Sequence, residues 1–249
     1  MRTRWLSVLF AAVAVGHAGQ VHSQTAEEVI EKHLVAMGGR AALEKIATRV
    51  LTGTISVTTL GGDLSGTIEL YNAAPNKSRT FVKIDATQFG LGQIVQDQRF
   101  NGTSGYVIDT MGGNRDLTGD QLETVRSNTF PSPLLKYKDA GSKLELLGRE
   151  KAGDRDAYVL RISPAKGPSA RMFIDAETYL MIKSVATINV PQVGADVEQT
   201  TQLSDYRDID GVKVPFHIQS INQFQTVSIT ATKVEQNVAI DDRMFSKPD

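Results

Sequence analysis

Residues 25–46 have the hydrophobic periodicity of two short helices. Thr25 and Glu28 stand at the spacing of a capping box, in which two side chains satisfy the free backbone N–H groups at a helix start. Gly38-Gly39 favours a helix end, and residues 40–46 predict a short second helix. The positions that recur at helical spacing are Val29, Ile30, His33, Leu34 and Met37. We therefore predict a helical hairpin at the front of the domain.

From residue 48 onward, hydrophobic residues recur at every second position, which is the periodicity of β-strands. Leu51, Ile55 and Val57 alternate with Thr and Ser, and later segments of ordinary strand length repeat this alternation. Turn signals such as Asn101-Gly102 and Asp210-Gly211 separate the segments and favour antiparallel hairpins. The pattern predicts about eleven strands, roughly the number at which a twisted sheet has to curl or close.

One segment, residues 111–133, interrupts the strands. Thr118 is placed to cap a short helix that carries Leu122 and Val125, and two prolines follow. Because proline is excluded from sheet interiors, we expect this segment to cross a sheet face or to close a barrel end. There is neither a linker nor a convincing internal repeat, so residues 24–249 are predicted to form a single α+β domain.

The start of the chain has the features of a signal peptide. Two arginines precede residues 5–15, an apolar run about half as long as a membrane span, and small residues follow it. We predict that residues 1–23 are cleaved, after Ala18 or Ser23, and the alternatives are a buried amphipathic helix or a retained anchor. The mature chain is expected to be exported, soluble and periplasmic.

Composition narrows the function. The chain has no Cys, so it cannot be lipid-anchored and its stability must come from burial rather than from disulfides. Its net charge is -1, without a basic patch for nucleic acid or for an anionic membrane. These properties exclude nucleic-acid binding and fit an envelope compartment.

Candidate chemistry is sparse. Outside residues 1–23 the histidines are His33 and His217, and both are interpreted as structural. Nucleophile motifs and zinc-ligand spacings are missing, and the Asp residues at 205–210 and 241–242 suit turns better than a calcium loop. We predict no enzyme activity, no metal and no cofactor. The remaining candidate is the apolar surface of a curved sheet, and the pattern favours a ligand cavity and a filled core equally.

Five motifs, in this order, resemble those of a known superfamily. They are the helix–Gly-Gly–strand segment 33–56, the Asn-Gly hairpin at 100–107, the "Asp-x-x-Thr-x-Leu" turn at 173–180, the "Tyr…Gly-Val-x-Val-Pro" strand pair at 205–218, and the ending 242–248. Together they resemble the LolA-like superfamily of outer-membrane lipoprotein-sorting proteins, in its uncharacterised exported branch. The resemblance covers nearly all of the chain after residue 23.

The resemblance implies a half-open, incomplete β-barrel whose helices act as a lid over an apolar concave face. It also implies binding of a lipid or of lipoprotein acyl chains without catalysis, by a monomer that could exchange its cargo with loading and receiving proteins at the inner and outer membranes. The lid would be residues 25–46 and 111–135. The implied apolar lining is Leu51, Ile55, Val57, Ile68, Leu70, Ile84, Leu122, Val125, Phe130, Leu134, Leu135, Leu160 and Ile174.

Two other functions remain open from the sequence. The same fold resembles the sensing domain of RseB-type regulators, so an envelope sensor or scaffold that binds a protein partner is the main alternative. A periplasmic hydrolase is the third hypothesis, and the missing nucleophile and base argue against it.

Overall fold

A computed structural model of the chain describes residues 24–165, 167–190 and 194–248. The predicted signal peptide, residues 1–23, lies outside the described residues. Thirteen strands form one sheet in the order β6-β5-β4-β3-β2-β1-β13-β12-β11-β10-β9-β8-β7, and every pairing is antiparallel. The end strands β6 and β7 do not pair with each other, so the sheet is open.

The strands are β1 (Thr48–Thr59), β2 (Gly62–Ala73), β3 (Lys77–Asp85), β4 (Gln93–Phe100), β5 (Gly105–Asp109), β6 (Arg115–Asp116), β7 (Lys143–Ala152), β8 (Arg155–Ser163), β9 (Ala170–Asp175), β10 (Met181–Val190), β11 (Ala195–Ile209), β12 (Val212–Ile221) and β13 (Gln225–Gln236). The helices are α1 (Ala26–Ala36), α2 (Arg40–Glu44) and α3 (Gly119–Ser127), with short 3-10 turns η1 (Thr87–Phe89), η2 (Pro133–Leu135) and η3 (Asp242–Phe245).

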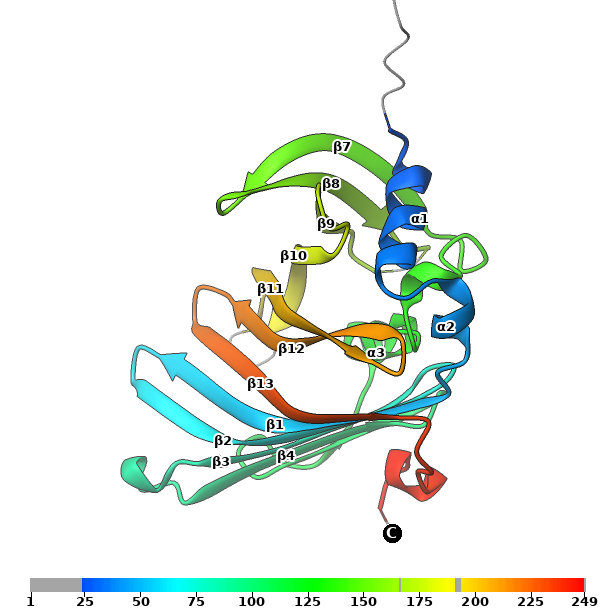
Figure 1. Ribbon diagram of the computed structural model, residues 1–249. Coiled ribbons are helices and arrows are strands. Elements are labelled where there is room, and N and C mark those ends of the chain that lie inside the picture. Colours follow the sequence, from blue (N-terminus) through cyan, green and yellow to red (C-terminus); the bar gives the residue numbers. More distant parts are fainter. Residues whose placement is uncertain (1–23, 166, 191–193, 249) are drawn as a thin grey trace, which may run out of the picture.

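The sheet curves into an arc, and α1 and α2 lie on its inner side (Figure 1). Strand β1 shows how the sequence creates two different faces. Leu51 and Ile55 are buried on the inner face, whereas Thr54 and Ser56 between and beside them are exposed on the outer face. The period-two pattern therefore places an aliphatic surface on the inside of the arc.

Strands β2 and β3 approach each other closely at one glycine. A Cβ atom on Gly66 would lie 1.9 Å from the carbonyl oxygen of Lys83 on β3, so only glycine fits there. Strand β1 has an irregularity at the same level, where its register with β13 shifts between Thr52 and Gly53. Bulges and glycines of this kind increase the local bend of a sheet.

Helix α1 packs its apolar side on the inner face of β8 and β9. The capping box is confirmed, because Glu28 N donates to Thr25 Oγ1 and Thr25 N donates to Glu28 Oε2. The helix ends at Ala36, and Gly38, just beyond its cap residue Met37, has φ +120° and lies against Gly211 in the β11–β12 turn. The backbone N–H of Lys213 donates to Met37 O (3.0 Å), which ties this end of the helix to that turn.

The outer face of β3 and β4 is held by a buried carboxylate. Asp97 accepts hydrogen bonds from Arg79 (2.8 Å) and from Arg99 (2.7 Å). Arg99 also donates to the carbonyl oxygen of Ser246 (3.2 Å), and Phe245 in η3 is fully buried. This group therefore attaches the C-terminal segment to the outside of the sheet.

Several predicted boundaries differ from the structure. The sheet has thirteen strands rather than about eleven, and the two-residue strand β6 is too short to show any period. The second helix ends at Glu44, earlier than residue 46. Thr118 occupies the N-cap position of α3 as expected, but its side chain makes no capping hydrogen bond.

Candidate functional site

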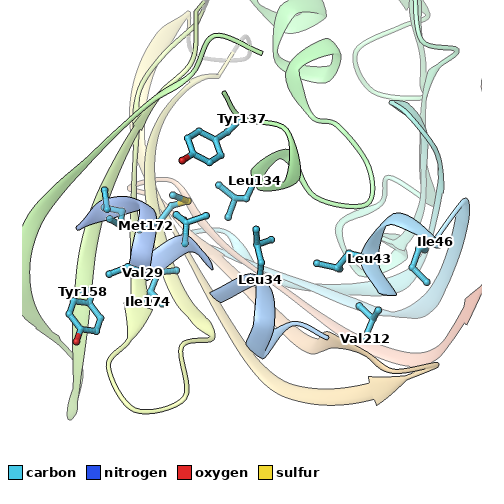
Figure 2. Close-up of a cluster of buried hydrophobic side chains, with 13 residues drawn as sticks. Val29, Leu34, Leu43, Ile46, Leu134, Tyr137, Tyr158, Met172, Ile174 and Val212 are labelled. Atoms are coloured by element: carbon cyan, nitrogen blue, oxygen red, sulfur yellow. The ribbon is translucent and has the colours of Figure 1, made fainter. Parts of the chain in front are cut away.

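The inner face has two halves with different packing. Near the helices, α1, α2 and η2 fill the arc with a cluster of thirteen buried side chains, which we call the covered cluster (Figure 2). Leu34 from α1 and Leu134 from η2 point toward each other at its centre (Figure 2). The members are Ala26, Val29, Ile30, Leu34, Leu43, Ile46, Leu134, Tyr137, Tyr158, Leu160, Met172, Ile174 and Val212.

The other half of the inner face is an aliphatic surface that we call the trough. In the described part of the chain, its cluster has members from strands alone and none from a helix. Three of its residues are buried by their neighbours in the sheet, and the other five are only partly buried. The trough consists of Ile55, Val57, Ile68, Leu70, Val82, Ile84, Val227 and Ile229. An apolar surface on the inside of a curve with part of its area still exposed can take a flexible apolar ligand.

The predicted lining residues fall into separate groups. Five of them, Ile55, Val57, Ile68, Leu70 and Ile84, belong to the trough, and Leu51 lies in an adjoining cluster that also contacts Leu70. A second group packs in or against the covered cluster, and it consists of Phe130, Leu134, Leu135, Leu160 and Ile174. Leu160 and Ile174 are completely buried beneath α1, so a ligand could reach them only if the helix moved.

Leu122 and Val125 stand apart from both groups. Both are half-buried on α3, which contains no fully buried residue, and neither belongs to a hydrophobic cluster of the described chain. The C-terminal end of α3 instead contacts the β4–β5 turn, where Arg126 donates to Thr103 O (3.2 Å). Their role in ligand binding stays a prediction.

Two hollows elsewhere on the described part of the molecule are polar. One, of about 260 Å³, is lined by residues that include Arg161, Arg171 and Glu198. Another, of about 470 Å³, lies among charged residues at the β7–β8 and β9–β10 turns. Neither is lined by any of the predicted apolar residues. An apolar ligand therefore has better complementarity with the trough than with these hollows.

The two histidines outside residues 1–23 lie far apart in the fold. His33 is buried on α1, and its Nδ1–H donates to the carbonyl oxygen of Tyr179 (2.9 Å), so the ring is held in one tautomer. Burial lowers the pKa of His33. His217 lies on β12, where its Nδ1 is 3.3 Å from the hydroxyl oxygen of Thr230. His33 is therefore packed in the interior, whereas His217 is only partly buried.

The most unusual residue of the inner face, Arg49, is not among the candidates predicted from the sequence. It is the second residue of β1 and points to the same side of the sheet as Leu51. Its Nε is buried without a hydrogen-bond partner, and its guanidinium carbon lies 5.3 Å from the centre of the Phe130 ring. A single charged residue at the start of a strand has no sequence pattern that would distinguish it from an ordinary solvated one.

Arg49 has no compensating charge within the described chain. None of the ion pairs in that part of the molecule includes it, and burial lowers its pKa to about 10, so it stays cationic at neutral pH. A cation–π contact contributes about 0.5–2 kcal/mol. Burying a charge costs several kcal/mol even after relaxation. The Phe130 contact therefore offsets only part of the cost of placing Arg49 here.

Comparisons with solved structures identify the architecture. A LolA superfamily protein from Nitrosomonas europaea superimposes with a TM-score of 0.58 at 12% identity, over 90% of this chain and 99% of the other. A putative outer membrane lipoprotein-sorting protein domain from Vibrio parahaemolyticus gives 0.55 at 11% identity, over 88% and 94%. The chain has the LolA-like fold. A DUF1329-family protein from Desulfovibrio piger has a TM-score of 0.59 at 12% identity, over 90% and 98%.

The LolA-like fold is thus recognised from the superposition of structures, and the sequence identity to these proteins is low. No protein-family model matches the chain, and no curated protein matches it by sequence. Among the described residues, no cluster of three or more His, Asp or Glu side chains could hold a metal ion. Among the same residues, no helix has both the length and the apolar character needed to span a bilayer.

Proposed function

We propose that this chain is a non-catalytic periplasmic carrier that binds the acyl chain of a lipid or of a lipidated protein in the trough of its LolA-like fold. The observation that carries the proposal is the partly exposed aliphatic surface on the inside of the arc, which strands build without help from a helix. The LolA-like neighbours support it, because one of them is described as a lipoprotein-sorting domain.

The binding free energy expected for an acyl chain in the trough suits a ligand that must be released again. Each buried methylene contributes about 0.8 kcal/mol, so covering half of a chain of about sixteen methylenes yields about 6 kcal/mol. Association entropy and ordering consume part of this amount. An open trough alone therefore predicts weak binding and fast exchange, and tighter binding needs a lid or a polar anchor.

The helices supply the lid in this proposal. Helices α1 and α2 and turn η2, which belong to residues 25–46 and 111–135, pack against part of the inner face, and Leu34 occupies space there that a longer ligand could take. Displacing α1 would extend the trough toward Leu160 and Ile174. The exported form would be a monomeric single domain, residues 24–249, that exchanges cargo with partners at the two membranes.

Two neighbouring residues of β1 provide a matched test. Val57 faces the trough and is half-buried, whereas Ser56 faces outward and is exposed. We expect Val57→Asn to weaken the uptake of a fluorescent fatty acid by about tenfold, because it places an amide in the apolar surface, and Ser56→Asn to leave uptake unchanged. Equal uptake by both variants and the wild type would remove the trough from the proposal.

A further inference from the structure

Two neighbouring polar side chains at the end of the trough each have a buried atom without a hydrogen-bond partner. Arg49 on β1 and Gln236 on β13 are direct partners in the antiparallel register. Arg49 Nε is a buried donor without an acceptor, and Gln236 Oε1 is a buried acceptor without a donor, so the two side chains do not satisfy each other. Gln236 is held in place, since its Nε2 donates to Ile209 O (3.2 Å). Buried polar atoms without partners are rare in folded proteins and require an explanation.

The surroundings of Arg49 place this pair between the trough and the helices. Phe130, which packs against the covered cluster, lies over the guanidinium, and Leu51 continues the same face of β1 toward Ile55 and Val57. The eight residue steps from Arg49 to Val57 span about 26 Å at the rise of a strand. One leaflet of hydrocarbon is about 15 Å thick, so an ordinary acyl chain fits along this distance.

We infer that Arg49 and Gln236 form a headgroup site that selects anionic amphiphiles, with the acyl chain lying in the trough. A carboxylate or phosphate oxygen would accept from Arg49 Nε–H and supply the missing counter-charge. A hydroxyl beside that oxygen, as in a phosphate monoester, would donate to Gln236 Oε1. Guanidinium groups bind such oxygens with favourable geometry. This inference rests on the proposed function and adds the chemical class of the ligand to it.

Three probes with the same chain separate the contributions. Below its second pKa of about 6, hexadecyl phosphate is a monoanion with both a charge and a hydroxyl donor. Palmitate has charge without a donor, and hexadecanol has a donor without charge. We would measure the affinity of each for the delipidated chain by titration below micelle-forming concentrations. We expect hexadecyl phosphate and palmitate to bind at least about tenfold more tightly than hexadecanol, which corresponds to about 1.4 kcal/mol. The better of the two anions distinguishes a phosphate headgroup from a carboxylate.

Variants of Arg49 complete the test. In Arg49→Gln, the anionic probes should bind no more tightly than hexadecanol, which should still bind. Arg49→Lys should keep part of the preference for anions because it keeps the charge. The control is Arg161→Gln on the outer face, where Arg161 pairs with Glu145 (2.8 Å). It should leave all three affinities unchanged.

The outcomes that overturn the inference are distinct from those that overturn the proposed function. If the wild type binds all three probes equally, the headgroup site is wrong and the carrier proposal stands. If it binds none of them, the carrier proposal itself is wrong. A preference that persists in Arg49→Gln also contradicts the inference. Should Arg49→Gln fail to fold, the wild-type ratio of anionic to neutral affinity and the Arg49→Lys variant still decide.

Discussion

Two charged side chains, Asp97 and Arg49, differ in whether the chain itself supplies a partner for their charge. Asp97 is nearly inaccessible, yet two arginines bond it, and these bonds lower its pKa although burial alone would raise it. Arg49 is half-buried with an inaccessible Nε, and no carboxylate of the described chain pairs with it. The first arrangement is complete within the chain. The second leaves Arg49 Nε without a partner, and that contrast is the basis for the headgroup site inferred above.

The Asp97 group provides the first prediction. Asp97→Asn would leave Arg79 and Arg99 close together without a counter-charge, so we expect the free energy of unfolding to fall by about 3–5 kcal/mol. The control is Asp156→Asn, because the Asp156–Lys151 pair is exposed and its loss should cost less than about 1 kcal/mol. Urea titration of both variants measures the difference. Similar losses in the two variants would show that the buried group does not hold β3, β4 and the C-terminal segment together.

His33 provides a prediction about pH. Burial lowers its pKa, so the unfolded chain binds the proton more tightly than the folded chain does. Stability should therefore be complete above pH 6.5 and should decline as the pH falls from there toward the lowered pKa. His33→Asn keeps a donor for Tyr179 O but cannot titrate, so its stability should fall less between pH 7.5 and 5 than that of the wild type. His217→Asn is the control, and a pH profile that His33→Asn leaves unchanged would contradict the assignment.

At the scale of elements, the sequence predicted the strands better than their partners. Alternation of Leu51, Ile55 and Val57 correctly identified β1 and its inner face. The pairing of β1 with β13, which joins Arg49 to Gln236, depends on contacts between residues about 180 positions apart, and no local period encodes it. The capping box located α1 because its bonds are local. Arg49 was missed because its burial comes from Phe130 and β13, both distant in the sequence.

Helix α1 permits a prediction with an internal control. Leu34 is completely buried at the centre of the covered cluster, whereas its neighbour Val35 is exposed. We expect Leu34→Ala to lower the free energy of unfolding by about 2–5 kcal/mol through the cavity it creates. Val35→Ala should change it by less than about 0.5 kcal/mol. Equal effects in a denaturant titration would mean that α1 does not pack as described.

At the scale of the whole molecule, the open sheet explains how one chain can be stable and still expose an apolar surface. The helices complete the core over only one half of the arc, and the outer ion pairs hold the C-terminal segment against the other side. The trough remains on the inner face, bounded at one end by Arg49. A closed barrel with a filled interior would have the same strand pattern but no such surface.

The most direct test of this account is native mass spectrometry of the full chain, purified gently from the envelope of cells that export it. We expect a population with the added mass of one lipid, which delipidation removes and which added hexadecyl phosphate or palmitate restores. A bare polypeptide mass, together with no uptake of either probe, would contradict the carrier function and would favour a protein-binding role for the LolA-like fold.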